Sequence, residues 1–117
     1  MLTLSPKHMQ VFSEAALERF EEMMVAHLKK FFPDFCDAAG EEQLRETIHY
    51  GIERAAAYRI TAACDVCKYI DLMVVLGCDF DTDKELPWAG GILKTRNTPG
   101  ARMSVLVRTA DKHLRHA

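Results

Sequence analysis

Apolar residues recur at steps of three and four along most of the chain, which is the spacing of one face of an α-helix. Ser5-Pro6 is typical of a helix start, because Ser can accept a hydrogen bond at the cap and Pro suits the first helical position. The pattern predicts a long first helix that ends at about Phe32, where Pro33 interrupts it. Its apolar stripe contains Met9, Phe12, Ala16, Phe20, Met23, His27 and Phe31, widened by Leu17, Met24 and Leu28.

Residues 41–60, with the sequence EEQLRETIHYGIERAAAYRI, give a second helical stripe after a predicted loop at residues 33–40. Gly51 lies inside this helix at a cost of about 1 kcal/mol relative to Ala. Gly51 and Ala55 are one turn apart, so together they would let another helix approach closely. The residues expected to point inward are Leu44, Ile48, Ile52, Ala55 and Ala56. The residues expected to face solvent are His49, Glu53 and Arg54.

The segment from Thr61 to Ala89, TAACDVCKYIDLMVVLGCDFDTDKELPWA, is the part around which we expect the rest of the chain to be organised. It predicts a third helix at about residues 62–76 that other elements cover on every side. Thr61 is a candidate N-cap, and Gly77 is placed to end the helix. An acidic loop follows and ends at Leu86-Pro87-Trp88. The apolar residues that predict the covered helix are Tyr69, Ile70, Leu72, Met73, Val74, Val75 and Leu76.

Beyond the acidic loop, Trp88–Leu93 is expected to form a short helical turn, and Thr98-Pro99 repeats the cap-plus-proline start of a helix. A last helix then runs to about Arg115, and we expect the basic segment 92–117 to be loosely docked because its apolar stripe is thin. That stripe consists of Met103, Leu106, Ala110 and Leu114. No segment alternates in the manner of a strand. The chain is therefore predicted to be all-α, a single domain (1–117) built as a compact bundle of four to five helices with the third central.

The net charge of −2 conceals an uneven distribution of charge. From Ile92 onward there are six Lys or Arg and one Asp, a net charge of +5, so the residues before it carry −7. A basic segment suits nucleic acid or an acidic protein patch, but cations also suit the C-terminal end of a helix. We prefer the second explanation and do not expect a nucleic-acid partner. No apolar run approaches the ~20 residues of a membrane span and the start lacks a secretory signal, so we expect no membrane partner and a cytoplasmic location.

Four cysteines raise the question of a metal site. Cys64 and Cys67, in a CxxC arrangement, would need two further ligands, for which Cys78 with either Cys36 or His49 are the candidates. Two thiols three residues apart on a helix share one face, where cysteine behaves as a small apolar residue. A thioredoxin-type motif would need a preceding strand, which the sequence does not predict. We therefore expect no metal and no cofactor.

The acidic loop imitates the start of a calcium-binding loop with the sequence DFDTD at residues 79–83. A calcium hand needs Gly at its sixth position and Glu at its twelfth, where this chain has Lys84 and Gly90. Asp side chains that bond the backbone amides of the loop are the simpler explanation, with calcium as a minor alternative. The sequence also lacks a nucleophile motif and a phosphate-binding glycine loop. We nominate no catalytic residue and expect a protein that is not an enzyme.

The segment Thr61–Ala89 resembles a family associated with type VI secretion gene clusters, through the shared pattern ITxxxDVxKYIDLMxxLGxDFDxDxxLPWA. Upstream, AALERFEEMMVAHLKKFFP and IHYGIERAAAYRI also look like that family, so the resemblance covers the chain from about Met9 to Ala89. Such proteins are small, helical and encoded beside secreted effectors and spike-tip proteins of bacteria. The resemblance implies an adaptor or co-chaperone that helps to load an effector onto the secretion spike.

Reversible recognition of another protein favours aromatic anchors ringed by polar groups, which is the composition of the acidic loop and its flanks. The alternative is that both aromatic residues of this segment fold back onto the third helix. Two other functions stay open: an immunity protein that blocks a toxin, and a nucleic-acid-binding regulator that uses the basic segment. A homodimer also stays open. The predicted partner-binding residues are Asp79, Phe80, Asp81, Asp83, Trp88, Arg102 and Arg108.

Overall fold

A computed structural model describes residues 13–115, and in this range the chain forms five helices and no strand. The helices are α1 (Glu14–Phe31), α2 (Pro33–Ala57), α3 (Ala63–Leu76), α4 (Pro87–Leu93) and α5 (Pro99–Arg115). The all-α prediction is therefore confirmed. The proposed helix start at Ser5-Pro6 and the stripe residues Met9 and Phe12 lie outside the described residues.

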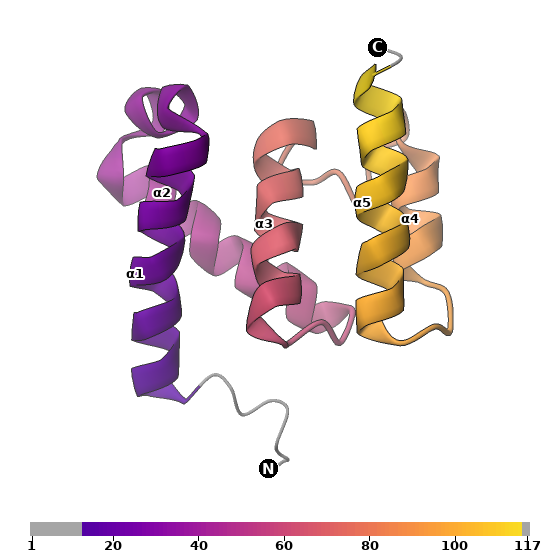
Figure 1. Cartoon of the computed structure of the whole chain (residues 1–117), viewed down its shortest axis with the longest axis horizontal. Helices are drawn as coiled ribbons and strands as arrows, with labels where there is room; N and C mark the ends of the chain where they lie inside the picture. Colours follow the sequence, from indigo (N-terminus) through magenta and orange to yellow (C-terminus); the bar gives the residue numbers. More distant parts are fainter. Residues whose placement is uncertain (1–12, 116–117) are drawn as a thin grey trace.

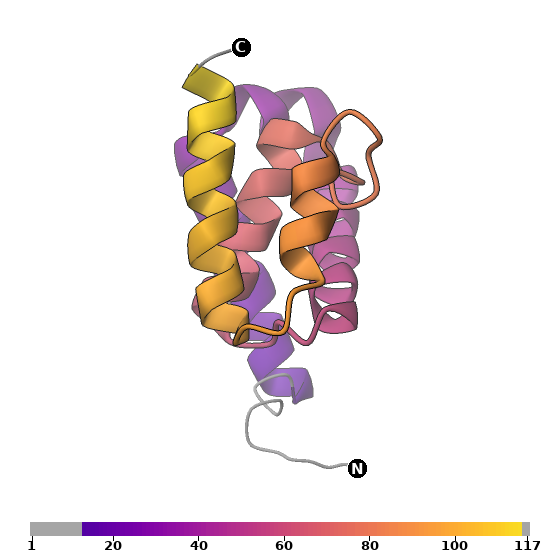
Figure 2. The ribbon, with the colours of Figure 1, turned by 90° about the vertical axis from the view of Figure 1, so that its right-hand side faces the viewer.

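The helices form two layers around α3. Figure 1 shows α1, α3 and α5 side by side, with α2 crossing behind α1 and α3 and with α4 behind α5. The view from the side in Figure 2 separates α4 from α5 and places α3 between this pair and the first two helices. Because α3 contacts α1, α2 and α5, the prediction that the third helix is central is confirmed. Among the described helices none combines the length and the apolar character needed to cross a membrane.

All five helices contribute to one hydrophobic core. The last helix enters this core through Met103 and Leu106, which are fully buried against α3 and α4. Thr98 caps α5 as expected, since its Oγ1 accepts a hydrogen bond from the backbone N–H of Ala101 at 3.2 Å. The largest fully buried side chains are Met24, Leu28, Leu44, Ile48, Ile60, Tyr69, Ile70, Met73, Phe80, Leu93, Met103 and Leu106.

The buried face of α1 is narrower than its apolar stripe. Ser13 caps this helix by accepting a hydrogen bond from the backbone N–H of Ala16 at 3.3 Å. The predicted inward residues Met23 and Phe31 are 48% and 58% exposed, so that part of the prediction is wrong. Helices α2 and α3 both pack on one side of α1 and leave the rest of it to solvent. The buried residues of α1 are Phe20, Met24, Val25 and Leu28.

Helix α2 begins earlier than predicted, and residues 33–40 do not form a loop. Pro33 occupies the first turn, where its missing N–H costs nothing, and Cys36 is buried in the core. Gly40 interrupts the helix with φ 85° and ψ 163°, a backbone conformation that favours glycine. The predicted boundary near residue 40 is thus a kink between two helical parts. Ala56 is exposed, contrary to the prediction that it points inward.

Gly51 permits the close contact between α2 and α3 that its position in the sequence suggested. A Cβ atom there would lie 2.6 Å from Cγ1 of Ile70 and 2.8 Å from Sδ of Met73. The side chains of α3 therefore rest directly on the backbone of α2. This contact fixes the separation of the two helices at the centre of the core.

The start of α3 and its burial both differ from the prediction. Ala62 rather than Thr61 occupies the N-cap, without a side-chain hydrogen bond. Gly77 ends the helix with φ 114°, as expected for a glycine at this position. The helix is not covered on every side, because Val75 is 41% exposed. Cys64, Lys68 and Val75 form an exposed strip along it.

Candidate partner-binding site

The acidic segment after α3 folds as a series of tight turns. The backbone N–H of Phe80 donates to the carbonyl of Gly77 at 3.1 Å, and that of Thr82 donates to the carbonyl of Asp79 at 3.0 Å. Asp83 closes the next turn, since its Oδ1 accepts from the backbone N–H of Glu85 at 2.9 Å. One of the Asp side chains therefore stabilises the loop in the way that the sequence suggested, while the others have different partners.

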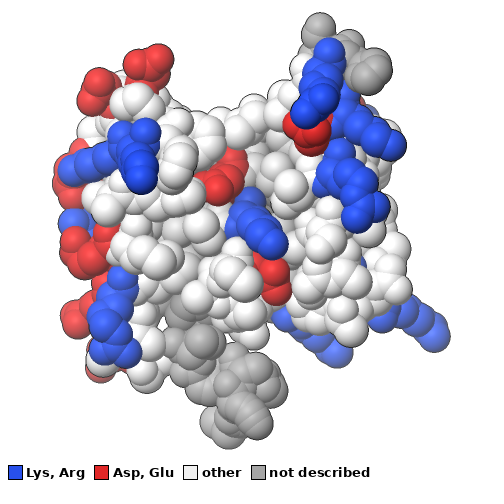
Figure 3. All heavy atoms as spheres, in the orientation of Figure 1, with Lys and Arg blue, Asp and Glu red and all other residues white. Residues whose placement is uncertain are grey.

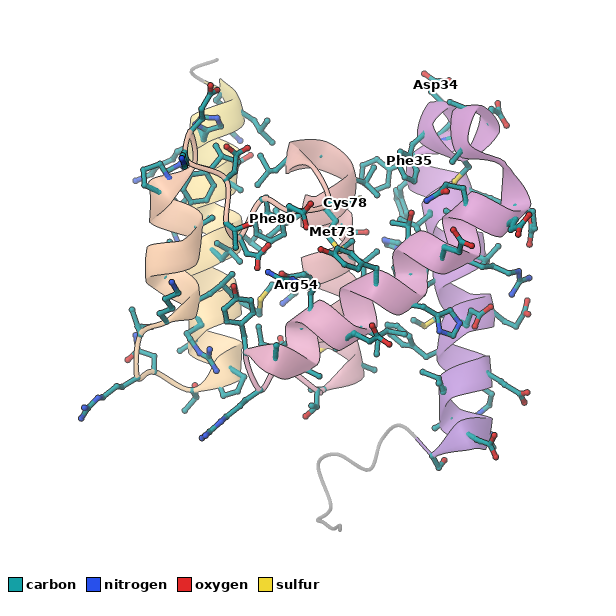
Figure 4. The ribbon with its side chains drawn as sticks, turned by 180° about the vertical axis from the view of Figure 1, so that it is seen from behind. Asp34, Phe35, Arg54, Met73, Cys78 and Phe80 are labelled. Atoms are coloured by element: carbon teal, nitrogen blue, oxygen red, sulfur yellow. The ribbon has the colours of Figure 1, made fainter. Side chains whose placement is uncertain are left out.

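Phe80 lies in the core rather than on a partner surface. Its side chain is fully buried, and its ring centroid is 5.0 Å from that of Tyr69 on α3. The prediction that Phe80 contacts a partner is therefore wrong, and the alternative, that this aromatic residue folds back onto the third helix, is correct. In Figure 4 Phe80 lies near Met73 in the middle of the molecule, far from Asp34 and Phe35 at the start of α2.

Asp81 is also buried and holds the loop against α2. Its carboxylate, 0% exposed, pairs with the guanidinium of Arg54 and accepts a hydrogen bond from the hydroxyl of Tyr58 at 2.6 Å. Burial, with a smaller contribution from Asp81, raises the pKa of Tyr58 to about 12. The pKa of Arg54 is raised mainly by its hydrogen bond to Asp81, so the guanidinium stays charged.

Two predictions therefore need correction at this pair: Asp81 is not a partner contact and Arg54 does not simply face solvent. Figure 4 shows Arg54 directed from α2 into the middle of the molecule, toward Phe80 and Met73. Burial of a charged side chain is favourable only when a partner compensates it, and the sequence separation of 27 residues concealed that partner.

The part of the loop after Asp81 lines a surface hollow, which we call the loop groove. The groove has a volume of about 280 Å³. Val75 and Leu114 form exposed apolar walls from α3 and α5, being 41% and 45% exposed, while Asp83 and Glu85 supply negative charge at the rim. The residues that line it are Val75, Leu76, Asp83, Glu85, Leu86, His113 and Leu114.

Trp88 lies next to the loop groove without lining it. It is half-buried, and its ring centroid is 5.6 Å from that of His113, which does line the groove. Of the predicted partner residues, the structure thus places Asp83 in the groove and Trp88 against one of its walls. Asp79 lies on the other side of the loop, where it accepts a hydrogen bond from the hydroxyl of Tyr50 on α2.

The two predicted arginine contacts of the basic segment have different positions. Arg102 is only 7% exposed and donates hydrogen bonds to the carbonyls of Leu93 at 2.7 Å and Asn97 at 3.1 Å. It holds the connection between α4 and α5, so the prediction that it contacts a partner or a phosphate is wrong. Arg108 is exposed on α5. Figure 3 shows basic side chains over and beside α5, and most of the acidic ones along the opposite edge, formed by α1 and α2, where basic side chains lie as well.

The cysteines nominated as zinc ligands are not gathered by the fold. Cys36 is buried at the start of α2, while Cys64 and Cys78 are exposed at opposite ends of α3. Among the described residues, the one group of three potential metal donors contains Cys67 together with His27 and Asp71. The three Asp side chains of the acidic loop do not converge on a calcium site either, since Asp81 points into the core.

The sequence missed the apolar walls of the groove. The sequence predicts that Val75 is a covered residue of the third helix and that Leu114 is the last member of the apolar stripe of the last helix. A signal was available at Leu114, which lies one turn beyond Ala110 near the end of its helix, where packing partners run out.

No family model, no curated protein and no solved structure matches the chain.

Proposed function

We propose that the protein is a non-catalytic adaptor or co-chaperone that binds a type VI secretion effector or spike-tip protein during loading, in the bacterial cytoplasm. The observation that carries the proposal is the loop groove, which lies within and beside the segment that resembles proteins of such gene clusters. Exposed apolar walls beside polar groups are the usual composition of a reversible protein interface.

The chemistry of the groove defines the partner that it would accept. Val75 and Leu114 offer apolar surface to a side chain of the partner, and Asp83 and Glu85 favour Lys or Arg beside it. We therefore expect the bound segment to present one apolar anchor flanked by basic residues. A groove of about 280 Å³ holds one large side chain, so further contacts would come from the surface around it.

The surroundings of Cys67, a half-buried thiol on α3, support a non-catalytic role. Burial, followed by the charge of Asp71, raises the pKa of Cys67 to about 11. A cysteine nucleophile needs the opposite shift, because the thiolate is the reactive form. His27 and Asp71 lie beside Cys67, yet this thiol stays protonated at neutral pH in the protein without a bound ligand.

The test is co-purification with the products of neighbouring genes, using a substitution in the groove. Leu114→Glu places a like charge beside Asp83 and Glu85 and should reduce the recovered partner at least about tenfold. Val107→Glu, at a position of α5 that is 37% exposed and outside the groove, is the matched control and should leave recovery unchanged. Equal recovery with both variants would reject the loop groove as the interface.

Secretion and toxicity assays separate this proposal from an immunity function. An adaptor should raise the amount of effector that is stable in the cell or secreted from it. An immunity protein should instead rescue a cell poisoned by the effector. Rescue of the cell without an effect on effector stability or secretion would contradict the adaptor function.

A further inference from the structure

Three side chains of types that bind metal ions meet between α1 and α3, and none of them lines the loop groove. His27 belongs to α1, and Cys67 and Asp71 belong to α3. One ring nitrogen of His27, the Sγ of Cys67 and one carboxylate oxygen of Asp71 all lie within 4.8 Å of one another. The fold thus brings an imidazole from one helix beside a thiol and a carboxylate from another.

The local geometry holds these donors together. Cys67 and Asp71 are four residues apart, so both side chains project from the same face of α3. Nε2 of His27 lies 2.9 Å and 3.1 Å from the two carboxylate oxygens of Asp71. The His27 ring also packs against Phe31, with a centroid separation of 4.9 Å, which limits its rotation.

We propose that His27, Cys67 and Asp71 bind one divalent transition-metal ion of the zinc class, which would join α1 to α3. Nitrogen, sulfur and oxygen donors are the ligand types of Zn²⁺, whereas a thiolate disfavours Ca²⁺ and Mg²⁺. Three protein ligands leave a fourth tetrahedral position for water. This site goes beyond the proposed binding of a partner and does not depend on it.

The distances require only a small rearrangement. Tetrahedral zinc with bonds of about 2.0–2.3 Å places its ligand atoms roughly 3.3–3.8 Å apart. Separations of up to 4.8 Å would need to close by about 1 Å, while Nε2 of His27, at 2.9 Å from Asp71, would need to move away by a few tenths of an ångström. Small changes of side-chain torsion supply both movements. His27 and Asp71 are 26% and 29% exposed, so an ion can reach the group from solvent.

The charges of the group also suit a cation. Asp71 and Cys67 are both partly buried, so a negative charge on either side chain is costly there without a cation beside it. A divalent ion at the centre would compensate that charge and displace the proton of the thiol. Cys64, one turn before Cys67, is exposed and is not one of the three converging donors.

The experiment uses the full chain, reduced and stripped of metal with a chelator. Titration with Zn²⁺ by calorimetry should show one equivalent bound per chain, and Co²⁺ should give a thiolate-to-cobalt charge-transfer band. An excess of about 100 times the dissociation constant should raise the melting temperature by roughly 5 °C or more. Cys67→Ser should abolish the charge-transfer band, and His27→Gln should weaken binding at least about tenfold.

Cys64→Ser is the matched control, since it removes a thiol of the same helix that lies outside the group. It should retain both the band and the stoichiometry. Circular dichroism of the metal-free variants checks that each one is folded, and a substitution at the exposed Cys64 should leave the fold intact. The site is rejected if the wild type binds less than one equivalent, or if the band survives Cys67→Ser and disappears in Cys64→Ser.

Discussion

Two carboxylates near α3 each contact a nitrogen-containing side chain from another helix, but their surroundings differ. Asp81, in the loop, is 0% exposed and pairs with Arg54 of α2 and with the hydroxyl of Tyr58. Asp71, on α3, is 29% exposed and pairs with His27 of α1. The Asp81 carboxylate is closed off from solvent, whereas the second pair is partly exposed and lies beside a thiol.

The difference shows that burial, more than residue type, determines what such a pair does. Removing one partner of a buried ion pair leaves an uncompensated charge, so we expect the loss of either Arg54 or Asp81 to be strongly destabilising. A partly exposed pair contributes little to stability, because water replaces either partner. The His27–Asp71 pair is therefore the one that can exchange its partner for a metal ion at low cost.

The largest effect that distinguishes the two regions should come from Asp81→Ala. It leaves the guanidinium of Arg54 and the hydroxyl of Tyr58 without their acceptor, so we expect the free energy of unfolding to fall by about 3 kcal/mol. Denaturant unfolding, monitored by circular dichroism, measures this decrease in the free energy of unfolding. Asp79→Ala, at an exposed acid of the same loop, is the control and should cost less than about 1 kcal/mol. If both variants lost a similar free energy of unfolding, the buried Asp81 would contribute no more to stability than the exposed Asp79.

A second test addresses the backbone that supports the buried pair. Gly90 of α4 packs against the loop, and a Cβ atom there would lie 2.7 Å from the carbonyl oxygen of Asp81. Gly90→Ala should therefore lower the free energy of unfolding by about 1–3 kcal/mol. Gly91→Ala meets nothing within 4 Å and should be neutral or stabilising by up to about 1 kcal/mol. Melting temperatures of the two variants check this, and an equal decrease would show that the close contact does not matter.

The smallest effect is expected from Asp71→Asn on the open side of α3. In metal-free buffer its free energy of unfolding should stay within about 1 kcal/mol of the wild type. The pKa of Asp71 is raised above 3.8, mainly by burial. The wild type therefore loses a stability contribution as the pH rises from 3.8 through the raised pKa, and the variant does not.

Denaturant unfolding at a series of pH values measures the difference between this variant and the wild type. The difference should shift in favour of the variant as the pH increases over that range. If Asp71→Asn costs as much as Asp81→Ala, the partly exposed pair is structural as well.

Much of the fold could be predicted because it depends on local signals. Apolar spacing of three and four gave the helices, Gly77 marked the end of α3, and Thr98-Pro99 marked the start of α5. The prediction of a loop at residues 33–40 is wrong because a local signal was ambiguous. Pro33 predicts the end of the first helix, but a proline in the first turn of a helix also permits a new helix to begin at once.

The contacts of the buried and partly buried arginines could not be predicted in the same way. Arg54 and Arg102 look like solvated side chains in the sequence, because their partners are tertiary: a loop carboxylate for Arg54 and the carbonyls of Leu93 and Asn97 for Arg102. The loop groove and the group of three metal donors could not be predicted for the same reason, because each brings together residues that are far apart in the sequence. His27 and Asp71 are separated by 44 residues, and no local pattern relates them.

The loop groove is built from α3, the acidic loop and the last turns of α5, so it is complete only when Leu114 is in place. During synthesis, the ribosome must pass this residue and release the C-terminal helix before the groove can close. A nascent chain that has reached only α4 therefore lacks one apolar wall of the groove. Under the function proposed above, recognition of a partner would be restricted to chains in which α5 has been made and has folded.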